Sequence, residues 1–393
     1  MRAAAILLLA LLLLLPAAAG AAERAPFAIG YLEIAGDPRY VPVRNYTGLK
    51  LKTVKRPFPG AEAALRESRV VARALGLTLG LERAEAATPA TLAAAARTMR
   101  DAAGIRVFLV DADADALLAL ADALRDDRVL LFNISETADR LRRADCRANL
   151  MHVIPSQAML GDAMAQYLAL ANWRRVLVLR GELPADAVLA DAFARSARKF
   201  GLKIVATKDF VLSNDPRERG RNNVRLLTAE PAHDVVFLAD SHGEFGRYVP
   251  YQTHRPRPVV GSEGLVAAAW HWAWERHGAP QLNQRFEKQA GREMRDADWA
   301  AWAAVRLIVE ALIRTGSTEF DALAAYLKGD ALTFDAYKGN PASFRPWNNQ
   351  LRQPVLLHTH NAVAARAPLD GFLHRTDILD TLGIDEPESS CRF

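Results

Sequence analysis

The sequence predicts an α/β protein of two lobes, each a doubly wound parallel sheet with helices on both faces. The chain has 393 residues, which is too many for one ordinary core. Short apolar runs alternate with amphipathic segments, which is typical of βαβ units. This alternation restarts after His152, where we expect the second lobe to begin.

The elements of the first lobe follow from continuous apolar runs, because strands covered on both faces are apolar throughout. We expect strands at 27–34, 77–86, 105–112 and 128–135, with helices at 61–76, 87–104 and 113–127. Gly76 and Gly104 end two of these helices, a common position for glycine.

The second lobe has the same pattern. We expect helices at 155–173 and 185–201, and strands at 174–181, 202–212, 233–240 and 255–265. An aromatic segment at 267–278 and a long helix at 297–316 follow. Residues 334–368 are predicted to form loops and strands, and the C-terminal tail, 371–393, is polar and irregular.

Residues 1–22 are typical of a cleaved signal peptide. Met1-Arg2 supplies a positive charge, Ala3 to Leu15 form an apolar run, and small residues follow Pro16. The apolar run is shorter than the roughly 20 residues that a membrane-spanning helix needs. We therefore expect a mature protein released into the periplasm.

Composition and motifs exclude several classes of protein. The chain is 51% hydrophobic and 24% charged, which is a globular composition. Its net charge of +5 is dispersed along the predicted helices, so we expect no nucleic-acid surface. No GxSxG, HExxH or P-loop motif occurs. We expect a monomer that is not an enzyme, with no catalytic residue, cofactor or metal.

Two cysteines, Cys146 and Cys391, occur in a chain that we expect to be exported, and an even number in an oxidising compartment favours a disulfide. The alternative is two unpaired thiols, because the sequence does not show whether the two residues are close together.

The stretch VFLVDADADALLAL, residues 107–120, places three carboxylates directly after an apolar run. A calcium loop is disfavoured because Ala116 stands where such a loop needs glycine. Asp113 or Asp115 would cap the following helix, where carboxylates accept bonds from free N–H groups. Asp111 ends the strand and is the best candidate to face a ligand cleft.

Further polar residues follow the neighbouring strands of the first lobe. Glu33 ends the first strand, while Asn133, Ser135 and Glu136 follow the fourth. Ser135 is either a helix cap or a ligand contact. If the carboxylates converge, the cleft would favour a cationic or polyhydroxylated solute or a metal ion, and repulsion would raise their pKa values unless a counter-charge enters.

The second lobe offers its own cleft candidates. Arg180 follows one strand, Asp240 and Ser241 follow another, and Glu263 lies in a Gly-Ser-Glu-Gly turn. Trp270 either belongs to the core or stacks on a ligand. His358 and His360 would share one face of a strand, but no third metal ligand is identifiable beside them, so a solvated face is favoured.

Several phrases resemble a known family. The order of elements, PSQAML at 155–160 and PAHDVVFLAD at 231–240 resemble type I periplasmic solute-binding proteins of ABC transporters, and the branched-chain amino acid-binding branch above all. The segments at 132–168, 255–265, 281–294, 344–357 and 371–391 resemble more specifically a subgroup named for its association with pyrroloquinoline-quinone (PQQ)-dependent alcohol dehydrogenase systems. The likeness covers almost the whole predicted mature chain.

The resemblance implies two lobes joined by a three-segment hinge, with crossovers near 152–156, 259–264 and 344–351. Lobe 1 would then comprise 27–154 and 265–345, and lobe 2 would comprise 155–260 and 346–370. It also implies solute capture for an ABC permease at the inner membrane, in a system linked to PQQ-dependent alcohol oxidation. A ligand-sensing receptor or scaffold of the same fold is the alternative.

The chain departs from the amino-acid binders of this branch at two loops. Those proteins present Ser/Thr-rich loops after the third and fourth strands, whereas this sequence has DADADA and NISETAD. The resemblance therefore does not carry an amino-acid ligand over to this chain.

Overall fold

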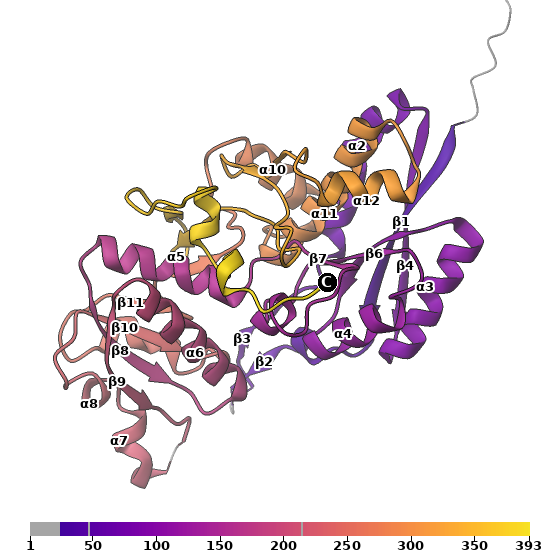
Figure 1. Ribbon diagram of the computed structural model, residues 1–393. Coiled ribbons are helices and arrows are strands. Elements are labelled where there is room, and N and C mark those ends of the chain that lie inside the picture. The colour runs from indigo at the N-terminus through magenta and orange to yellow at the C-terminus, as the bar shows by residue number, and fades with distance from the viewer. Residues whose placement is uncertain (1–23, 46–47, 214) are drawn as a thin grey trace, which may run out of the picture.

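The computed structural model describes residues 24–45, 48–213 and 215–393, which form two α/β lobes (Figure 1). The predicted signal peptide, residues 1–22, lies outside the described residues. Each lobe contains one parallel sheet, as the alternation of apolar and amphipathic segments predicts.

The first sheet has five parallel strands in the order β4-β1-β5-β6-β7. They are β1 (Ala25–Ile34), β4 (Leu77–Ala86), β5 (Val107–Asp111), β6 (Leu130–Asn133) and β7 (Leu150–His152). A Cβ at Gly30 in β1 would lie 2.2 Å from a ring carbon of Phe108 in β5. Glycine at this position therefore allows the two central strands to pair beside a large aromatic ring.

Helices cover both faces of the first sheet. One face carries α2 (Phe58–Ala74), α10 (Ala279–Ala290), α11 (Asp296–Thr315) and α12 (Phe320–Lys328). The other carries α3 (Pro89–Ala103) and α4 (Ala114–Ala123). Within the described ranges, no helix combines the length and the apolar character needed to cross a membrane.

The second sheet has four parallel strands in the order β11-β10-β8-β9. They are β8 (Arg175–Arg180), β9 (Lys203–Asp209), β10 (Val235–Ala239) and β11 (Val259–Gly261). Helices α5 (Gln157–Leu170) and α6 (Pro184–Lys199) share an apolar core with one face. The short helices α8 (Val224–Leu227) and α9 (Val249–Gln252) pack on the other, and α7 (Arg219–Asn222) precedes them.

A small antiparallel sheet lies where the two cores meet. It consists of β12 (Val266–Ala268), β15 (Val355–His358) and β16 (Val363–Ala367). Along β15, Leu356 packs in the core of the first lobe, while Val355 and Leu357 pack in the core of the second. The sequence predicts strands in this region, but the pairing of 266–268 with 355–358 is not visible from the sequence.

Two of the connections between the lobes run side by side. Residues 153–156 connect β7 to α5, and residues 344–351 lead from β14 (Pro341–Ala342) towards β15. The His152 N–H donates to the Asn349 carbonyl at 2.8 Å, and the Leu351 N–H donates to the His152 carbonyl at 2.9 Å. These backbone bonds tie the two connections into one unit.

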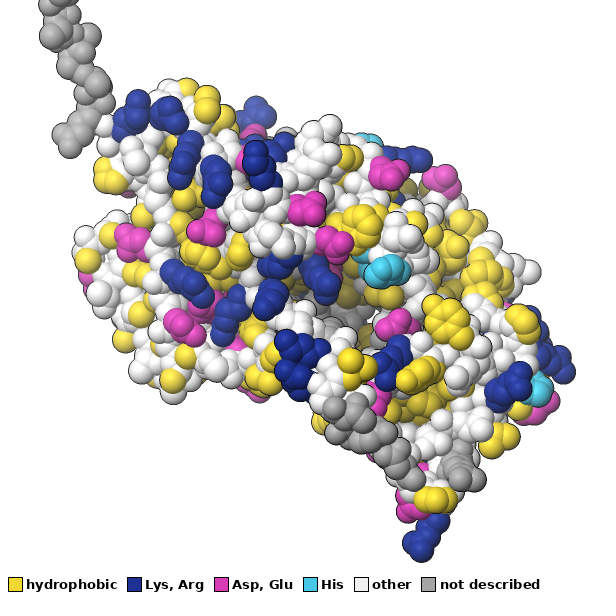
Figure 2. Space-filling view, turned by 180° about the vertical axis from the view of Figure 1, so that it is seen from behind, with side chains coloured by type: hydrophobic (Ala, Val, Ile, Leu, Met, Phe, Trp, Pro, Cys, Tyr) yellow, Lys and Arg dark blue, Asp and Glu magenta, His cyan; other side chains and the backbone are white. Residues whose placement is uncertain are grey.

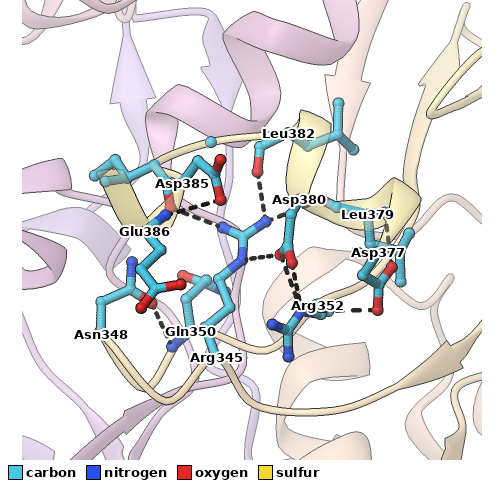
Figure 3. Close-up of polar contacts among 12 residues, drawn as sticks. Arg345, Asn348, Gln350, Arg352, Asp377, Leu379, Asp380, Leu382, Asp385 and Glu386 are labelled. Carbon is cyan, nitrogen blue, oxygen red and sulfur yellow. Dashed lines mark hydrogen bonds and ion pairs between the residues drawn. The ribbon is translucent and has the colours of Figure 1, made fainter. Parts of the chain in front are cut away.

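The C-terminal segment packs closely against this unit, although the sequence suggests only a polar, irregular tail. The guanidinium group of Arg345 is 1% exposed and lies inside the curve of the segment (Figure 3). Its Nε donates to Asp380 Oδ1 at 2.7 Å, and its Nη2 donates to the carbonyls of Leu379 and Leu382 at 2.9 and 2.6 Å. Arg352 donates to the same Asp380 carboxylate at 2.9 and 3.0 Å.

The disulfide between Cys146 and Cys391 is confirmed, with 5.7 Å between the two Cα atoms. It joins the C-terminal segment to the loop that precedes β7. The same segment reaches the second lobe, where the Gly383 N–H donates to Asp162 of α5 at 2.8 Å. The chain terminus is therefore fixed to both lobes and to the connections between them.

Candidate ligand cleft between the lobes

The two sheets place their topological switch points at the candidate cleft. In each sheet the chain winds outwards in opposite directions from two neighbouring strands, β1 and β5 in the first lobe and β8 and β10 in the second. Ligands of doubly wound sheets bind beyond the carboxyl ends of such strands. The hairpin of β2 (Val43–Arg44) and β3 (Lys50–Lys52) lies between the lobes on this side (Figure 1).

Asp111, at the end of β5, is the centre of a polar cluster on the first lobe. Its buried carboxylate accepts hydrogen bonds at Oδ1 from Ser135 Oγ at 2.7 Å, Tyr40 Oη at 2.6 Å and Arg39 Nη2 at 3.2 Å. Oδ2 accepts a bond from Arg56 Nη1 at 3.2 Å. A carboxylate offers about four acceptor positions. The chain itself therefore fills the acceptor capacity of Asp111.

Arg39 is also held by its own neighbours. Its Nε and Nη2 donate to the Asp37 carboxylate at 2.9 and 2.6 Å, and its Nη1 donates to Ser135 Oγ at 3.1 Å. Burial opposes ionisation of Asp37, but these bonds from Arg39 prevail and lower the pKa of its carboxyl. Burial and the Asp111 charge raise the pKa of Tyr40, so its hydroxyl stays a hydrogen-bond donor.

Glu33, near the end of β1, has two arginine partners. Its Oε1 accepts a bond from Arg83 Nε at 2.7 Å, and its Oε2 lies 3.3 Å from Arg56 Nη1. Arg56 therefore bridges Glu33 and Asp111. Burial raises the pKa of Glu33, while the hydrogen bond from Arg83 and the charge of Arg56 oppose this shift.

The cluster balances its charges internally, with three carboxylates against three guanidinium groups, those of Glu33, Asp37, Asp111, Arg39, Arg56 and Arg83. The structure brings Glu33 and Asp111 together as the sequence suggests. Arginines of the chain provide the counter-charges, so this cluster has no excess of negative charge, and the preference for a cationic solute stays a prediction.

The stretch 111–115 contains the helix cap that the sequence predicts. Asp113 caps α4, accepting a bond from the Ala116 N–H at 2.9 Å. Asp115 lies in the first helical turn, is exposed, and pairs with Arg140. Among the described residues no group of three metal ligands occurs, whether here or around His358.

The loop after β6 is held in shape by its own side chains. Asn133 Oδ1 accepts bonds from the N–H groups of Ser135 and Glu136 at 3.2 and 2.9 Å, and its Nδ2 donates to the Glu136 carbonyl at 2.7 Å. The Glu136 carboxylate accepts a bond from the Ala138 N–H at 2.8 Å. Asn133 and Glu136 thus position the loop, and Ser135 joins the Asp111 cluster.

The end of this loop docks on the first helix of the second lobe. The Thr137 carbonyl accepts a bond from the Gln157 N–H at 2.9 Å, and Asp139 Oδ1 accepts one from the Ala158 N–H at 2.8 Å. Asp139 Oδ2 also pairs with Arg195 of α6 at 2.6 Å. Two N–H groups at the N-terminus of α5 therefore donate to the opposite lobe.

A pocket of about 450 Å³ lies at the strand ends of the second lobe. Its walls are mainly apolar and come from α5, α6, β10 and β12, together with Leu51 of β3 in the first lobe. The rings of Phe193 and Phe237 stack in its wall, with 3.8 Å between centroids and 8° between planes. Asp240, Ser241 and Glu263 provide polar lining.

Other residues of the second lobe hold Asp240, Ser241 and Arg180 in place. The buried Asp240 carboxylate accepts bonds from the N–H groups of Gly243 and Gly246 at 2.8 and 2.7 Å and shapes the loop after β10. The Ser241 N–H donates to Asp186 at 2.6 Å. Arg180 does not line the pocket; its Nε pairs with Asp209 at the sheet edge at 2.7 Å.

Trp270 lies in the core of the first lobe and does not face the cleft. Its ring is 2% exposed and parallel to that of Trp299, with 6.1 Å between centroids, and its Nε1 donates to Asn283 at 2.8 Å. The core interpretation of Trp270 is the one that the structure supports.

Five residues of the candidate cleft were not predicted from the sequence: Arg39, Tyr40 and Arg56 of the first lobe and Phe193 and Phe237 of the second. Arg39 and Tyr40 occur in a turn directly after β1, which is a usable signal because that turn lies at the strand-end rim. Phe193 and Phe237 resemble ordinary core residues of a helix and a strand.

Figure 2 shows Lys and Arg side chains gathered on the first-lobe side of a hollow near the middle of this face.

Comparisons with known proteins agree with this architecture. Residues 74–216 match the model of a family described as periplasmic binding protein, which is a non-enzymatic family. No curated protein matches the chain in sequence.

Three solved structures show the extent of the likeness in fold. A branched-chain amino acid ABC transporter periplasmic ligand-binding protein from Burkholderia xenovorans LB400 aligns with a TM-score of 0.67 and 15% identity, over 86% of this chain and 94% of its own. A leucine-, isoleucine-, valine-, threonine- and alanine-binding protein from Brucella ovis, in a closed conformation, gives 0.66 and 16%, over 93% and 98%. An ABC transporter solute-binding protein from Rhodopseudomonas palustris BisB5, in complex with 3,4-dihydroxybenzoic acid, gives 0.63 and 14%, over 87% and 94%.

Proposed function

Starting from its periplasmic-binding-protein sequence and type I periplasmic-binding-protein fold, we propose that this chain captures a small solute between its lobes and presents it to an ABC transporter. The observation that carries the proposal is the 450 Å³ pocket at the switch point of the second lobe, which also includes Leu51 of the first. Pockets of this size, largely apolar with a few polar groups, are typical of small-molecule sites. The similar proteins include binders of amino acids and of an aromatic acid.

Binding would involve a hinge movement of the two lobes. The paired connections at His152 and Leu351 are the axis that we propose, because backbone bonds hold them together while few elements cross between the lobes. Closure would bring the Asp111 cluster of the first lobe over the pocket of the second. Hydrogen bonds and ion pairs within the chain already hold the cluster, so it would provide a polar cover without rearranging.

We also propose a cellular location and a partner system for this protein. The signal-peptide pattern of residues 1–22 supports the periplasm, where a permease at the inner membrane would receive the solute. The subgroup phrases at 132–168 and 371–391 support a link to PQQ-dependent alcohol oxidation. Deletion of the gene should slow growth on alcohols oxidised by such an enzyme and leave growth on succinate unchanged; equal growth on both carbon sources would remove the link.

Native mass spectrometry of protein released from the periplasm without refolding tests solute capture. We expect a bound small molecule that is lost on mild denaturation. Phe193→Leu should reduce its occupancy, because Phe193 lines the pocket. Phe245→Leu is the matched control: Phe245 stacks on Phe210 at 4.1 Å in the other core of the same lobe and does not line the pocket. Equal solute occupancy in both variants would contradict binding at this site.

A further inference from the structure

We infer that the first lobe has a second binding site, for a small dianion with an apolar body, at the edge of its sheet opposite the cleft. A pocket of about 500 Å³ lies there, at the amino ends of β6 and β7. The candidate cleft lies at the carboxyl ends of the strands of this sheet, where β5 ends at Asp111. The pocket is therefore separate from the cleft, and the inference does not depend on the proposed function.

The pocket is rich in positive charge. Among the lining residues that the structure describes, none is Asp or Glu, whereas five are cationic: Arg125, Arg128, Arg147, Lys328 and Arg392. They come from the segment after α4, the loop before β7, the helix α12 and the C-terminal segment. A hollow lined by charges of one sign attracts a ligand of the opposite sign.

Two carboxylates partly balance three of these arginines. Asp122 accepts hydrogen bonds from Arg147 and Arg125, at 2.6 and 2.5 Å, and these bonds lower the pKa of its carboxyl to about 2. Arg128 pairs with Asp321 at 2.5 Å, but the two side chains are 64% and 77% exposed, so this pair is weak. One carboxylate shared by two guanidinium groups leaves positive charge in excess.

Lys328 and Arg392 form no ion pair with a carboxylate of the described residues. Lys328 Nζ donates to the Ala148 carbonyl at 2.7 Å, and Arg392 Nη1 donates to the Cys391 carbonyl at 3.0 Å. An ammonium group has three N–H donors and a guanidinium group has five, so both side chains keep donors for a ligand. Five positive charges thus stand against three negative ones, from two aspartates and the α-carboxylate of Phe393. A ligand with two negative charges would balance the pocket.

The apolar part of the wall indicates the body of the ligand. Phe320, Ala324 and Lys328 follow one another at intervals of four residues in α12, so they lie on one face of this helix. Val129 and Leu130, at the start of β6, add aliphatic surface. An apolar body would pack on these side chains while its anionic groups reach the guanidinium groups, which bond carboxylates through two parallel N–H donors.

The disulfide gives the pocket a fixed wall. Cys146 lines the pocket and is bonded to Cys391, the residue before Arg392. The cross-link therefore keeps Arg392 at the same pocket as Arg147. A dianion that bonds both arginines would fasten the C-terminal segment to the first lobe a second time.

Four probes separate the contributions of charge and of the apolar body. These are isophthalate, benzoate, isophthalamide and sulfate, measured by isothermal titration calorimetry on the mature protein freed of solute. Benzoate has one charge, isophthalamide has none, and sulfate lacks the apolar body. We expect isophthalate to bind roughly tenfold more tightly than isophthalamide, which corresponds to about 1.4 kcal/mol, and several-fold more tightly than benzoate or sulfate. Its affinity should fall as sodium chloride is added, because salt screens exposed charges.

Variants test the location of the site. Lys328→Gln and Arg392→Gln should each weaken isophthalate binding several-fold and leave the melting temperature nearly unchanged, because both side chains are exposed. Lys288→Gln is the matched control, since Lys288 is exposed on α10 and does not line the pocket. Phe193→Leu should not affect isophthalate binding, because Phe193 lines the pocket of the second lobe.

The outcomes separate this site from solute capture in the cleft. The inference is wrong if isophthalate does not bind, if it binds no better than any of the other three probes, or if its binding survives both Lys328→Gln and Arg392→Gln. Isophthalate binding that is lost only in Phe193→Leu would place the probe in the cleft, which removes the second site and leaves solute capture intact. A protein that carries no solute from the periplasm would count against capture and leave this site standing.

Discussion

The buried pair of Arg345 and Asp380 gives the sharpest test of how the C-terminal segment is held. Asp380→Asn would keep the shape of the side chain but remove the counter-charge of Arg345, whose guanidinium group is 1% exposed and whose pKa is already lowered by burial. It would also weaken the bonds from Arg352 at 2.9 and 3.0 Å. Leaving a buried charge without its partner costs about 3 to 5 kcal/mol. We expect a loss of unfolding free energy of this size.

The assay is equilibrium unfolding in urea at pH 7, followed by tryptophan fluorescence and far-UV circular dichroism. The control is Asp209→Asn, because the pair of Arg180 and Asp209 has the same chemistry but is 34% and 46% exposed. Exposed pairs contribute about 0 to 1 kcal/mol, so the control should lose less than that. A loss below about 1 kcal/mol in Asp380→Asn would refute the view that this pair is an essential anchor of the segment.

A double-mutant cycle refines the result. Arg345→Met alone should also destabilise the protein, because the carbonyls of Leu379 and Leu382 lose their donor. The double variant should cost less than the sum of the single variants, since removing both charges leaves no unpaired ion. Strict additivity would show that the two side chains act independently.

Three further predictions concern other parts of the fold. Replacing both Cys146 and Cys391 by serine opens a cross-link with a sequence separation of 245, and should cost about 3 to 5 kcal/mol in urea unfolding at pH 7, while a reductant should not change the variant further. Burial, with His358 and His360, lowers the pKa of His271 to about 4. The unfolded state therefore binds more protons between about pH 6.5 and 4, and stability should fall as the pH drops through this window, by at most about 3 kcal/mol from this group. His271→Asn should reduce the loss of unfolding free energy between pH 7 and pH 4, measured by urea unfolding at both pH values. Substitution of the exposed His254 should leave that loss unchanged. Gly264→Ala should lower the melting temperature, because its φ of 75° and a Cβ placed 2.1 Å from a β11 carbonyl oxygen both oppose a side chain, with a cost above about 2 kcal/mol.

Much of the fold could be predicted because its signals are local. The strand ending at Asp111 is apolar throughout, and Gly104 ends the helix before it in the left-handed conformation, so local pattern and final structure agree. The pairing of β12 with β15 could not be predicted in this way. The paired residues of these two strands are some ninety residues apart in the sequence. Both strands are short, so the sequence of neither one specifies the other as its partner.

The candidate site was only partly predictable, for a related reason. A strand end marks which residues reach the rim, and this rule located Glu33, Asp111 and Ser135. It does not show which other side chains approach them. Arg56 is 55 residues from Asp111 in sequence and meets it because α2, which follows Arg56, packs against β4 and contacts β1 through Phe58 and Tyr31. The charge balance of the cluster is therefore a property of the tertiary structure.

The Asp111 cluster also affects which solutes can bind with high affinity. For a zwitterionic solute to use Asp111, Arg39 and Tyr40 would have to leave it, although both lie within 3.2 Å of its Oδ1. Breaking a buried charged pair costs about 3 to 5 kcal/mol, and each 1.4 kcal/mol corresponds to about a tenfold change in affinity. An amino acid would thus lose about a hundredfold to a few thousandfold in affinity before making any new contact. A solute bound in the Phe193 pocket does not lose this affinity, because it leaves the hydrogen bonds of the Asp111 cluster intact and is only covered by the cluster.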